Sequence, residues 1–462
     1  MNGYIDNSAL IPPYRPDDQV QMEGWHPDWI GGLIMAQMRV ESATDEGTFA
    51  AAVKVLDHYR EMGVNAMWLT PIQDKGTSGN GYSNMGPHTV DPALTGCDSY
   101  EEGWKVVKRF VDEAHKRDIR IYLDLIVWGT VKESPLVTAH PDWYAGFLEV
   151  WGGYKFNWYS DEFKTWFFDR AEKIVLDTGI DGFRVDLEPF VTGHKLFAAL
   201  RRRLLEKGRK ISIMAECTSE RDEAYDFDEQ ITNEDPERWH MHTMFTKRHN
   251  IVDAVKNGWG HGTIWAQEND RGGRARFYCL CLSCHDNPRP CIEQDRLIAG
   301  YGAVFGPYIP LWFIGDDWGN LLKPGCGMFN NYIDWSRLDL PEDRAFYEDF
   351  KRMLRIRRQY PEIFTFFPEN HREANIEKVT SDCPLQAYAR YAGQCAVIVL
   401  PNDGTAPLAA TATVDPAAIG LKADKACRYT LLFPDTELTA DGDTLHVTIP
   451  ARSLAVVLAE QE

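Results

Sequence analysis

The chain alternates short apolar runs with longer stretches whose apolar residues recur at helical spacing, from about residue 30 to residue 360. Tyr100 to Arg117 is one such helical stretch, and the run that follows it, Ile119 to Val127, is apolar almost throughout. A strand of that composition is expected to be buried on both faces, as in a parallel sheet covered by helices. The alternation therefore predicts repeated strand–helix units.

Eight apolar runs have the length of strands, and eight strand–helix units predict a (β/α)8 barrel, an α/β fold. The expected strands are Leu33 to Val40, Ala66 to Leu69, Ile119 to Val127, Gly182 to Leu187, Ile211 to Glu216, Phe227 to Ile231, Phe277 to Ser283 and Tyr308 to Ile314. The sixth of these is the most weakly marked. Helices are expected over Phe49 to Met62, Phe163 to Asp177, His194 to Lys207 and Asp343 to Tyr360.

Two regions depart from this alternation. Between residues 129 and 160 the periodicity fails and Trp, Tyr, Gly and Pro gather, which predicts a short excursion from the barrel rim after strand three. From residue 371 to 462 short alternating strands separated by turn residues predict a C-terminal antiparallel β-sandwich domain. The barrel is then expected to comprise residues 1–128 and 161–370.

The composition narrows the possible partners. The 462 residues carry a formal net charge of -20, so phosphate backbones and anionic lipid headgroups are repelled, and we expect no nucleic acid and no membrane partner. No long apolar run occurs, and Met1 to Leu10 lacks the features of a secretory signal. These observations predict a cytoplasmic protein with reduced cysteines and a neutral ligand. A secreted mature form and the oligomeric state stay open.

Polar residues close several of the apolar strands. In a (β/α)8 barrel the active site lies at the carboxyl ends of the strands, so such residues are candidates for chemistry. They are Asp124 on strand three, Arg184 and Asp186 on strand four, Glu216 on strand five, and His285 and Asp286 on strand seven. The sequence thus predicts carboxylates and hydrogen-bond donors that converge at one rim.

Ordered motifs make the chain similar to the α-amylase superfamily, glycoside hydrolase family 13. The most specific is Gly-Phe-Arg-x-Asp at 182–186, and further matches lie at 65–72, Gly81 with Tyr82, 90–92 and 310–317. The resemblance implies a retaining α-glycosidase that hydrolyses α-glucosidic bonds in α-glucans or maltooligosaccharides. It implies Asp186 as nucleophile, Glu216 as general acid/base and Asp286 as the third catalytic carboxylate. Tyr82, Arg184 and His285 would bind substrate.

The residue chemistry agrees with that implication. Retaining hydrolysis needs a carboxylate nucleophile and a carboxylic acid about 5 to 5.5 Å apart, which adjacent strands four and five can supply. Arg184 lies two residues before Asp186 on the same strand face, and a guanidinium lowers the pKa of a nearby carboxyl. We predict a raised pKa for Glu216, caused by apolar neighbours and the negative nucleophile. No cofactor is expected.

The end of strand three departs from the superfamily pattern. Relatives have Asn-His where this chain has Trp128 and Gly129. Neither residue can ligate a hard cation, so the usual calcium is not expected and we predict no metal site. We place Trp128 among the substrate-binding residues as a hypothesis, because an indole in this position can fill the space or stack on a sugar.

Other interpretations stay open from sequence. A transglycosylase of the same superfamily uses the same residues, and a non-catalytic carbohydrate-binding or scaffold protein can keep the barrel without the activity. Arg184 and Asp186 alone could form only a structural ion pair. Cys279, Cys281, Cys284 and His285 also have some character of a metal cluster.

Overall fold

Eight parallel strands form a closed barrel in the computed structural model, which describes residues 27–186, 196–215, 229–231, 277–285, 294–304, 308–319, 332–365 and 376–461. The strands are β1 (Met35–Met38), β2 (Ala66–Leu69), β3 (Arg120–Ile126), β7 (Gly182–Asp186), β8 (Ser212–Ala215), β9 (Glu229–Ile231), β10 (Phe277–Cys281) and β11 (Tyr308–Phe313). They follow one another around the barrel in chain order, and β11 closes on β1. The predicted (β/α)8 barrel is confirmed, including its weakly marked sixth strand.

The register of the barrel brings distant residues together. Asp124 on β3 lies directly beside Arg184 on β7, and Ile126 lies beside Asp186. On the other side of β3, Trp68 of β2 lies beside Tyr122. Polar residues of β3 and β7 therefore meet inside the carboxyl end of the barrel, where a (β/α)8 enzyme builds its site.

Local signals in the sequence begin and end the helices between the strands. The side chain of Thr48 accepts a hydrogen bond from the backbone N–H of Ala51 and caps α3 (Phe49–Met62), which ends at Gly63 with φ 101°. Such a left-handed terminal residue favours glycine. The other long helices are α5 (Tyr100–His115), α7 (Asp161–Thr178), α9 (Leu196–Glu206), α13 (Arg296–Val304) and α14 (Pro341–Gln359).

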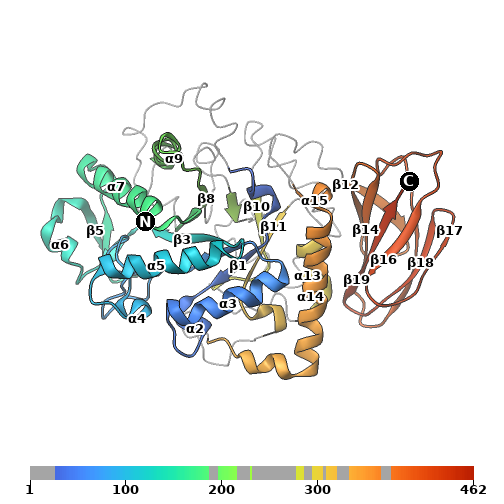
Figure 1. The fold of residues 1–462 in the computed structure, drawn as a ribbon, viewed down its shortest axis with the longest axis horizontal. Coiled ribbons are helices and arrows are strands. Elements are labelled where there is room, and N and C mark those ends of the chain that lie inside the picture. Colours follow the sequence, from blue (N-terminus) through green and yellow to red (C-terminus); the bar gives the residue numbers. More distant parts are fainter. Residues whose placement is uncertain are drawn as a thin grey trace.

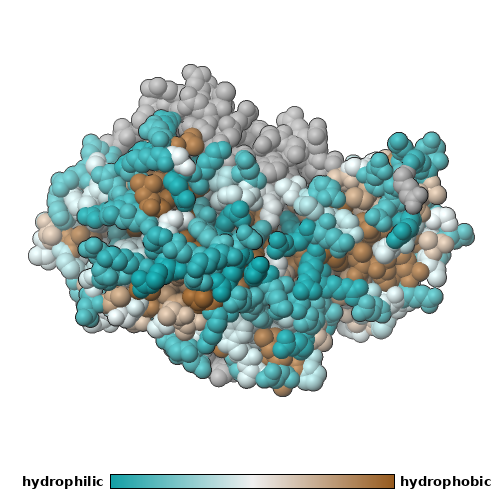
Figure 2. Space-filling view, viewed as in Figure 1, coloured by the Kyte–Doolittle hydropathy of each residue, from teal (hydrophilic) through white to brown (hydrophobic). Residues whose placement is uncertain are grey.

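Hydrophilic residues cover much of the outward face of the barrel helices, most visibly along α5 (Figure 2). Its apolar side chains, including Val107, Phe110 and Val111, face the barrel core instead. This division is what amphipathic spacing dictates for a helix laid on a sheet. Among the helices that the structure describes, none has the length and apolar character needed to cross a membrane.

The excursion after β3 contains a small antiparallel sheet that the sequence did not predict. Its strands are β4 (Gly129–Val131), β5 (Tyr144–Leu148) and β6 (Gly153–Phe156), in the order β4-β6-β5, with the short helix α6 (Pro135–Ala139) between β4 and β5. β5 is largely exposed, so it has no alternating apolar pattern to reveal it. In Figure 1 this sheet lies at one end of the molecule, near α7.

The C-terminal domain is an antiparallel β-sandwich, as predicted. Its strands are β12 (Ile376–Ser381), β13 (Ala387–Ala392), β14 (Cys395–Asn402), β15 (Leu408–Thr413), β16 (Arg428–Phe433), β17 (Leu438–Asp441), β18 (Thr444–Ile449) and β19 (Ser453–Glu460). β12 pairs with both β13 and β15, so it belongs to both layers. Alanine, valine, leucine and isoleucine side chains from the two layers form a separate core between them.

The sandwich packs on α13 and α14, at the opposite end of the molecule from the excursion (Figure 1). A Cβ built on Gly300 of α13 would lie 2.1 Å from Cδ2 of Leu454 on β19, so only glycine fits there without movement. Leu454 and Val456 join the same hydrophobic cluster as the barrel strands. One face of the sandwich is thus continuous with the barrel core, while the core between its two layers is separate.

Candidate active site

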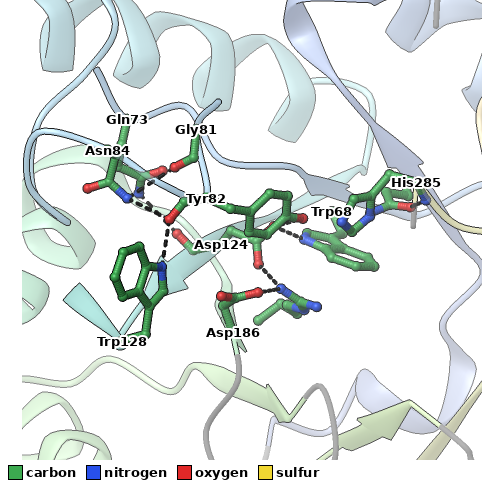
Figure 3. A network of polar contacts seen from close by, with 11 residues as sticks. Trp68, Gln73, Gly81, Tyr82, Asn84, Asp124, Trp128, Asp186 and His285 are labelled. Carbon is green, nitrogen blue, oxygen red and sulfur yellow. Dashed lines mark hydrogen bonds and ion pairs between the residues drawn. The ribbon is translucent and has the colours of Figure 1, made fainter. Parts of the chain in front are cut away.

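A single guanidinium lies between two carboxylates at the carboxyl end of the barrel (Figure 3). Nη1 of Arg184 donates to Oδ1 of Asp124 at 2.8 Å and to Oδ1 of Asp186 at 2.6 Å. The side chains of Arg184 and Asp124 are 0% exposed, whereas that of Asp186 is 6% exposed. The predicted contact between Arg184 and Asp186 is therefore present, and it extends to Asp124.

Asp124 is surrounded by donors. Besides Arg184, Nε1 of Trp68 donates to its Oδ2 at 3.0 Å and the hydroxyl of Tyr82 donates to the same oxygen at 3.1 Å. Burial raises the pKa of Asp124 above its ordinary value, and the charge of Arg184 with the Arg184 and Trp68 hydrogen bonds opposes that rise. Because Arg184, Trp68 and Tyr82 all donate to Asp124, these hydrogen bonds favour its ionised form.

His285 is fixed by Gln37 of β1. The backbone N–H of His285 donates to Oε1 of Gln37 at 3.0 Å, which identifies Oε1 as the acceptor and leaves Nε2 of the same amide as the donor. That Nε2 lies 2.6 Å from Nδ1 of His285. Nδ1 therefore accepts, and a neutral imidazole carries its proton on Nε2. His285 is thereby oriented as a hydrogen-bond donor through Nε2.

Aromatic rings enclose the charged cluster. The Arg184 guanidinium carbon lies 4.9 Å from the centroid of the Trp68 ring and 5.8 Å from that of Tyr82. The rings of Tyr82 and His285 are parallel to within 7°, with centroids 4.9 Å apart. Cation–π contacts of this kind favour the charged guanidinium in a site that excludes water.

Such an arrangement suits a carboxylate that must react while ionised. Arg184 supplies a fixed positive charge to Asp186, and a cation in contact favours the charged form of a carboxyl group. Asp124 shares that charge and holds the guanidinium from the neighbouring strand. Asp186 lies at the end of β7 and is 4% exposed.

Two predicted catalytic residues, Glu216 and Asp286, lie outside the described residues. Their roles, and the distance between Glu216 and Asp186, stay predictions. β8 ends at Ala215, one residue before Glu216, and runs beside β7 with Ala215 next to Val185.

Trp128 differs from what the sequence predicted. The indole is 2% exposed, and its Nε1 donates to the carbonyl oxygen of Tyr82 at 2.8 Å. The ring also makes an edge contact with Trp151, at a centroid distance of 4.9 Å. Burial on these sides does not support direct contact with a sugar. Trp128 instead lies behind the loop that carries Tyr82 (Figure 3).

Sequence comparisons find similarity to one enzyme family and to several named enzymes. Residues 41–148 match the family described as glycogen debranching enzyme, glucanotransferase domain. A malto-oligosyltrehalose trehalohydrolase from Arthrobacter ramosus is 25% identical over 350 residues, which cover 64% of this chain and 58% of that protein. A cyclomaltodextrinase from a Bacillus species is 23% identical over 404 residues, 78% of this chain and 66% of that one. The chain thus spans less than two thirds of these relatives.

Structural comparison extends the similarity over nearly the whole chain. An α-amylase from Geobacillus thermoleovorans, solved with acarbose, aligns over 95% of this chain and 100% of its own, with a TM-score of 0.73 and 16% identity. A maltogenic α-amylase from Thermotoga neapolitana aligns over 93% and 98%, with a TM-score of 0.70 and 17% identity. These solved structures share the barrel and the sandwich. The chain is therefore similar in sequence to enzymes of the α-amylase superfamily and has the same fold as the solved α-amylases.

The end of strand three differs from the superfamily pattern, and packing in the excursion explains why. A Cβ on Gly129 would lie 2.0 Å from the carbonyl oxygen of Tyr154, because β6 runs directly against β4. A histidine at this position therefore has no room. Position 128 does not suit the superfamily's calcium either, since an indole N–H that already donates to Tyr82 offers no lone pair to a cation.

The interpretation of the strand-seven cysteines as a metal cluster gains no support. Sγ of Cys279 lies inside the barrel, 3.5 Å from Sδ of Met214 and 4.0 Å from Sδ of Met35. Within the ranges that the structure describes, no group of three or more His, Cys, Asp or Glu residues is arranged to hold a metal ion. The side chain of Cys281 lies outside those ranges. Cys279 and Cys284 are both buried.

Gln37 and Trp68 belong to the site although the sequence analysis did not select them. Both lie on short strands that are otherwise apolar and fully buried. A buried glutamine needs hydrogen-bond partners, so a lone glutamine in an apolar strand was the available signal for Gln37. Trp68 gave no comparable signal, because tryptophan is common in buried strands.

Proposed function

We propose that this protein is a retaining α-glycosidase that cleaves α-glucosidic bonds in maltooligosaccharides or longer α-glucans. The observation that carries the proposal is the Arg184 guanidinium held between Asp124 and Asp186 at the carboxyl end of the barrel. The names of the sequence relatives, a malto-oligosyltrehalose trehalohydrolase and a cyclomaltodextrinase, support the substrate class. The chain's net charge of -20 agrees with a neutral ligand.

In the proposed first step, Asp186 attacks the anomeric carbon while Glu216 protonates the leaving oxygen, so that the glycosidic bond breaks and a glycosyl ester forms. Arg184 favours the ionised nucleophile before the attack. In the second step Glu216 takes a proton from water, which attacks the anomeric carbon and releases Asp186. Asp286 and Nε2–H of His285 would bind sugar hydroxyls and stabilise the positive charge and geometry of the transition state.

The test is a substrate panel of maltooligosaccharides, starch, isomaltose, trehalose and sucrose, with products separated by chromatography. Proton NMR during the first minutes reports the anomer released, before mutarotation mixes the two forms. We expect the α-anomer, since two displacements at one carbon retain its configuration. Release of the β-anomer, or no turnover on any member of the panel, would contradict the proposal.

Transglycosylation is the second candidate, because the family match at residues 41–148 is to a glucanotransferase domain. The same glycosyl ester would then be transferred to a sugar hydroxyl in place of water. Adding glucose or maltose as acceptor distinguishes the two reactions. New, longer oligosaccharides without a net rise in the number of reducing ends indicate a transferase, whereas a rise in reducing ends with an unchanged product distribution indicates a hydrolase.

A further inference from the structure

The excursion sheet clamps the loop that carries Tyr82. The backbone N–H of Val131 donates to the carbonyl oxygen of Asn84 at 2.8 Å, and Oγ of Ser134 donates to that of Met85 at 2.6 Å. These two bonds hold the loop immediately after Tyr82. The loop and the excursion are separated by about 45 residues of sequence. They are joined by hydrogen bonds to main-chain carbonyl oxygens of the loop.

Trp128 makes the most direct of these contacts to Tyr82 itself. Its Nε1 lies 2.8 Å from the carbonyl oxygen of Tyr82, whereas Nδ2 of Asn84 approaches the same oxygen only to 3.4 Å. The indole is held in place by Trp151 on one side and by β6 on another. A Cβ on Gly153 would lie 3.0 Å from Cη2 of Trp128, which shows how closely β6 packs on the ring.

The residue that Trp128 holds connects two parts of the candidate site. The Tyr82 hydroxyl donates to Oδ2 of Asp124 at 3.1 Å, and its ring stacks on His285. A tyrosine side chain has few rotatable bonds, so a fixed carbonyl and a fixed hydroxyl leave the ring little freedom. Displacement of the Tyr82 backbone would therefore be transmitted to Asp124, and from there to Arg184.

We propose that Trp128 is a positioning residue, which acts on catalysis through Tyr82 and not through contact with the sugar. Its indole N–H fixes the Tyr82 backbone so that the phenol meets Asp124 and the ring meets His285. This inference rests on the proposed glycosidase function. It assigns the excursion a role in the alignment of the charged cluster, in addition to any contact with substrate.

Trp128→Phe removes the N–H and keeps an aromatic ring, and Trp143→Phe is its matched control. Trp143 lies in the same excursion, is 3% exposed, and its indole N–H has no hydrogen-bond partner in the described part of the chain. We expect kcat/KM on a maltooligosaccharide to fall about 10-fold in Trp128→Phe, the effect of one buried hydrogen bond, and less than twofold in Trp143→Phe. Equal effects of the two substitutions would overturn the proposal.

A double-mutant cycle with Tyr82→Phe tests whether the effect travels through Tyr82. If Trp128 acts by holding the phenol on Asp124, then Trp128→Phe should cost less than twofold once the phenol hydroxyl is gone. Independent effects that multiply would show that Trp128 acts elsewhere, and would overturn the proposal. Trp128→His, which keeps a ring N–H, should recover part of the loss seen in Trp128→Phe.

Hydrogen exchange separates this inference from the proposed function. Amides of residues 81–86 should exchange faster in Trp128→Phe than in wild type or in Trp143→Phe, since the Tyr82 carbonyl loses its stronger partner. Unchanged exchange in that segment overturns the positioning role even if the enzyme is active. Failure of wild type to cleave any α-glucoside instead refutes the proposed function, while exchange still reports whether Trp128 holds the loop.

Discussion

Two clusters of buried carboxylates at the barrel differ in what surrounds them. Asp317, in the short 3-10 helix Asp316–Trp318 that follows β11, is 0% exposed. It accepts hydrogen bonds from the Tyr59 hydroxyl at 2.8 Å, from Nε1 of Trp312 at 3.1 Å and from the backbone N–H of Gly315 at 3.1 Å. The other cluster has two carboxylates, Asp124 and Asp186, on one guanidinium, and Asp186 keeps slight exposure.

The comparison indicates how a fold separates structural from reactive carboxylates. Donors that converge on one enclosed anion, as the Tyr59 hydroxyl, the Trp312 indole and the Gly315 backbone do at Asp317, stabilise it, and His58 Nε2 lies 3.4 Å from its second oxygen. Two anions that share one cation leave the pair with a net negative charge, and under the proposed function the member at the end of β7, Asp186, attacks the anomeric carbon. Removing Asp317 should therefore affect stability first, and removing Asp186 should affect turnover first.

The largest expected effect is that of Asp186→Asn on turnover. The substitution keeps the shape of the side chain but removes the nucleophile, so we expect kcat to fall by about 1,000-fold or more. Arg184 keeps Asp124 as its partner, so the free energy of unfolding should change by no more than about 1 kcal/mol. Steady-state kinetics and urea denaturation measure the two quantities. A variant that retains normal turnover would mean that the cluster is structural, or that the protein is a non-catalytic scaffold.

Asp317→Ala should show the opposite separation. Three buried donors would lose their common acceptor, so we expect the free energy of unfolding to fall by about 3–5 kcal/mol. The kcat of the folded fraction should stay within twofold of wild type. Asp334→Ala is a control, because Asp334 caps a short 3-10 helix (Trp335–Asp339), and loss of such a cap is worth about 1 kcal/mol. Urea denaturation followed by tryptophan fluorescence measures the free energy of unfolding of each variant. Equal losses in the two variants would contradict the comparison.

Tyr82→Phe sharpens the comparison with a smaller effect. It removes one of three donors to Asp124 and keeps the ring on His285, so we expect kcat/KM to fall about 10-fold with little change in stability. Tyr144→Phe is matched to it, since the Tyr144 hydroxyl bonds to Thr130 in the excursion and not to the charged cluster. Equal kinetics in the two variants would show that the phenol hydroxyl has no part in catalysis.

His88 lies apart from both carboxylate clusters, and its effect is on the pH dependence of stability. Burial, with the nearby charge of Arg170, lowers the pKa of His88 to about 3. The unfolded chain therefore takes up this proton first as the pH falls, and stability is lost from about pH 6.5 down toward pH 3. One proton gives a slope of at most about 1.4 kcal/mol per pH unit. His88→Gln should show a shallower slope between pH 6 and pH 4 in urea denaturation, and an unchanged slope would contradict this account.

The sequence predicted those parts of the molecule that repeat a simple pattern. Apolar strands closed by polar residues located Arg184, Asp186 and Asp124 at the barrel rim, because the parallel register leaves little choice of neighbours. The excursion sheet was not predicted, since its strands are short and β5 is exposed. Gln37 was missed because its meaning depends on His285, which follows it by 248 residues.

Trp128 illustrates a different limit of sequence analysis. Its position beside strand three indicated a place at the substrate pocket, but the side chain bonds to a main-chain carbonyl, and any residue type at position 82 would offer that acceptor. Such partners leave no trace in residue identity. Glu216 and Asp286 lie outside the described residues, so the proposed geometry of the acid and the third carboxylate stays a prediction.

Leu454 of the sandwich packs against Gly300 of α13, and this contact affects whether the barrel and the sandwich can be expressed separately. A helix surface without a side chain is stabilised by the neighbour that packs against it. A barrel expressed alone would therefore expose an apolar groove to solvent. Separate expression of the barrel and the sandwich is therefore expected to yield aggregation-prone fragments. The sandwich covers apolar surface of the barrel that would otherwise be exposed.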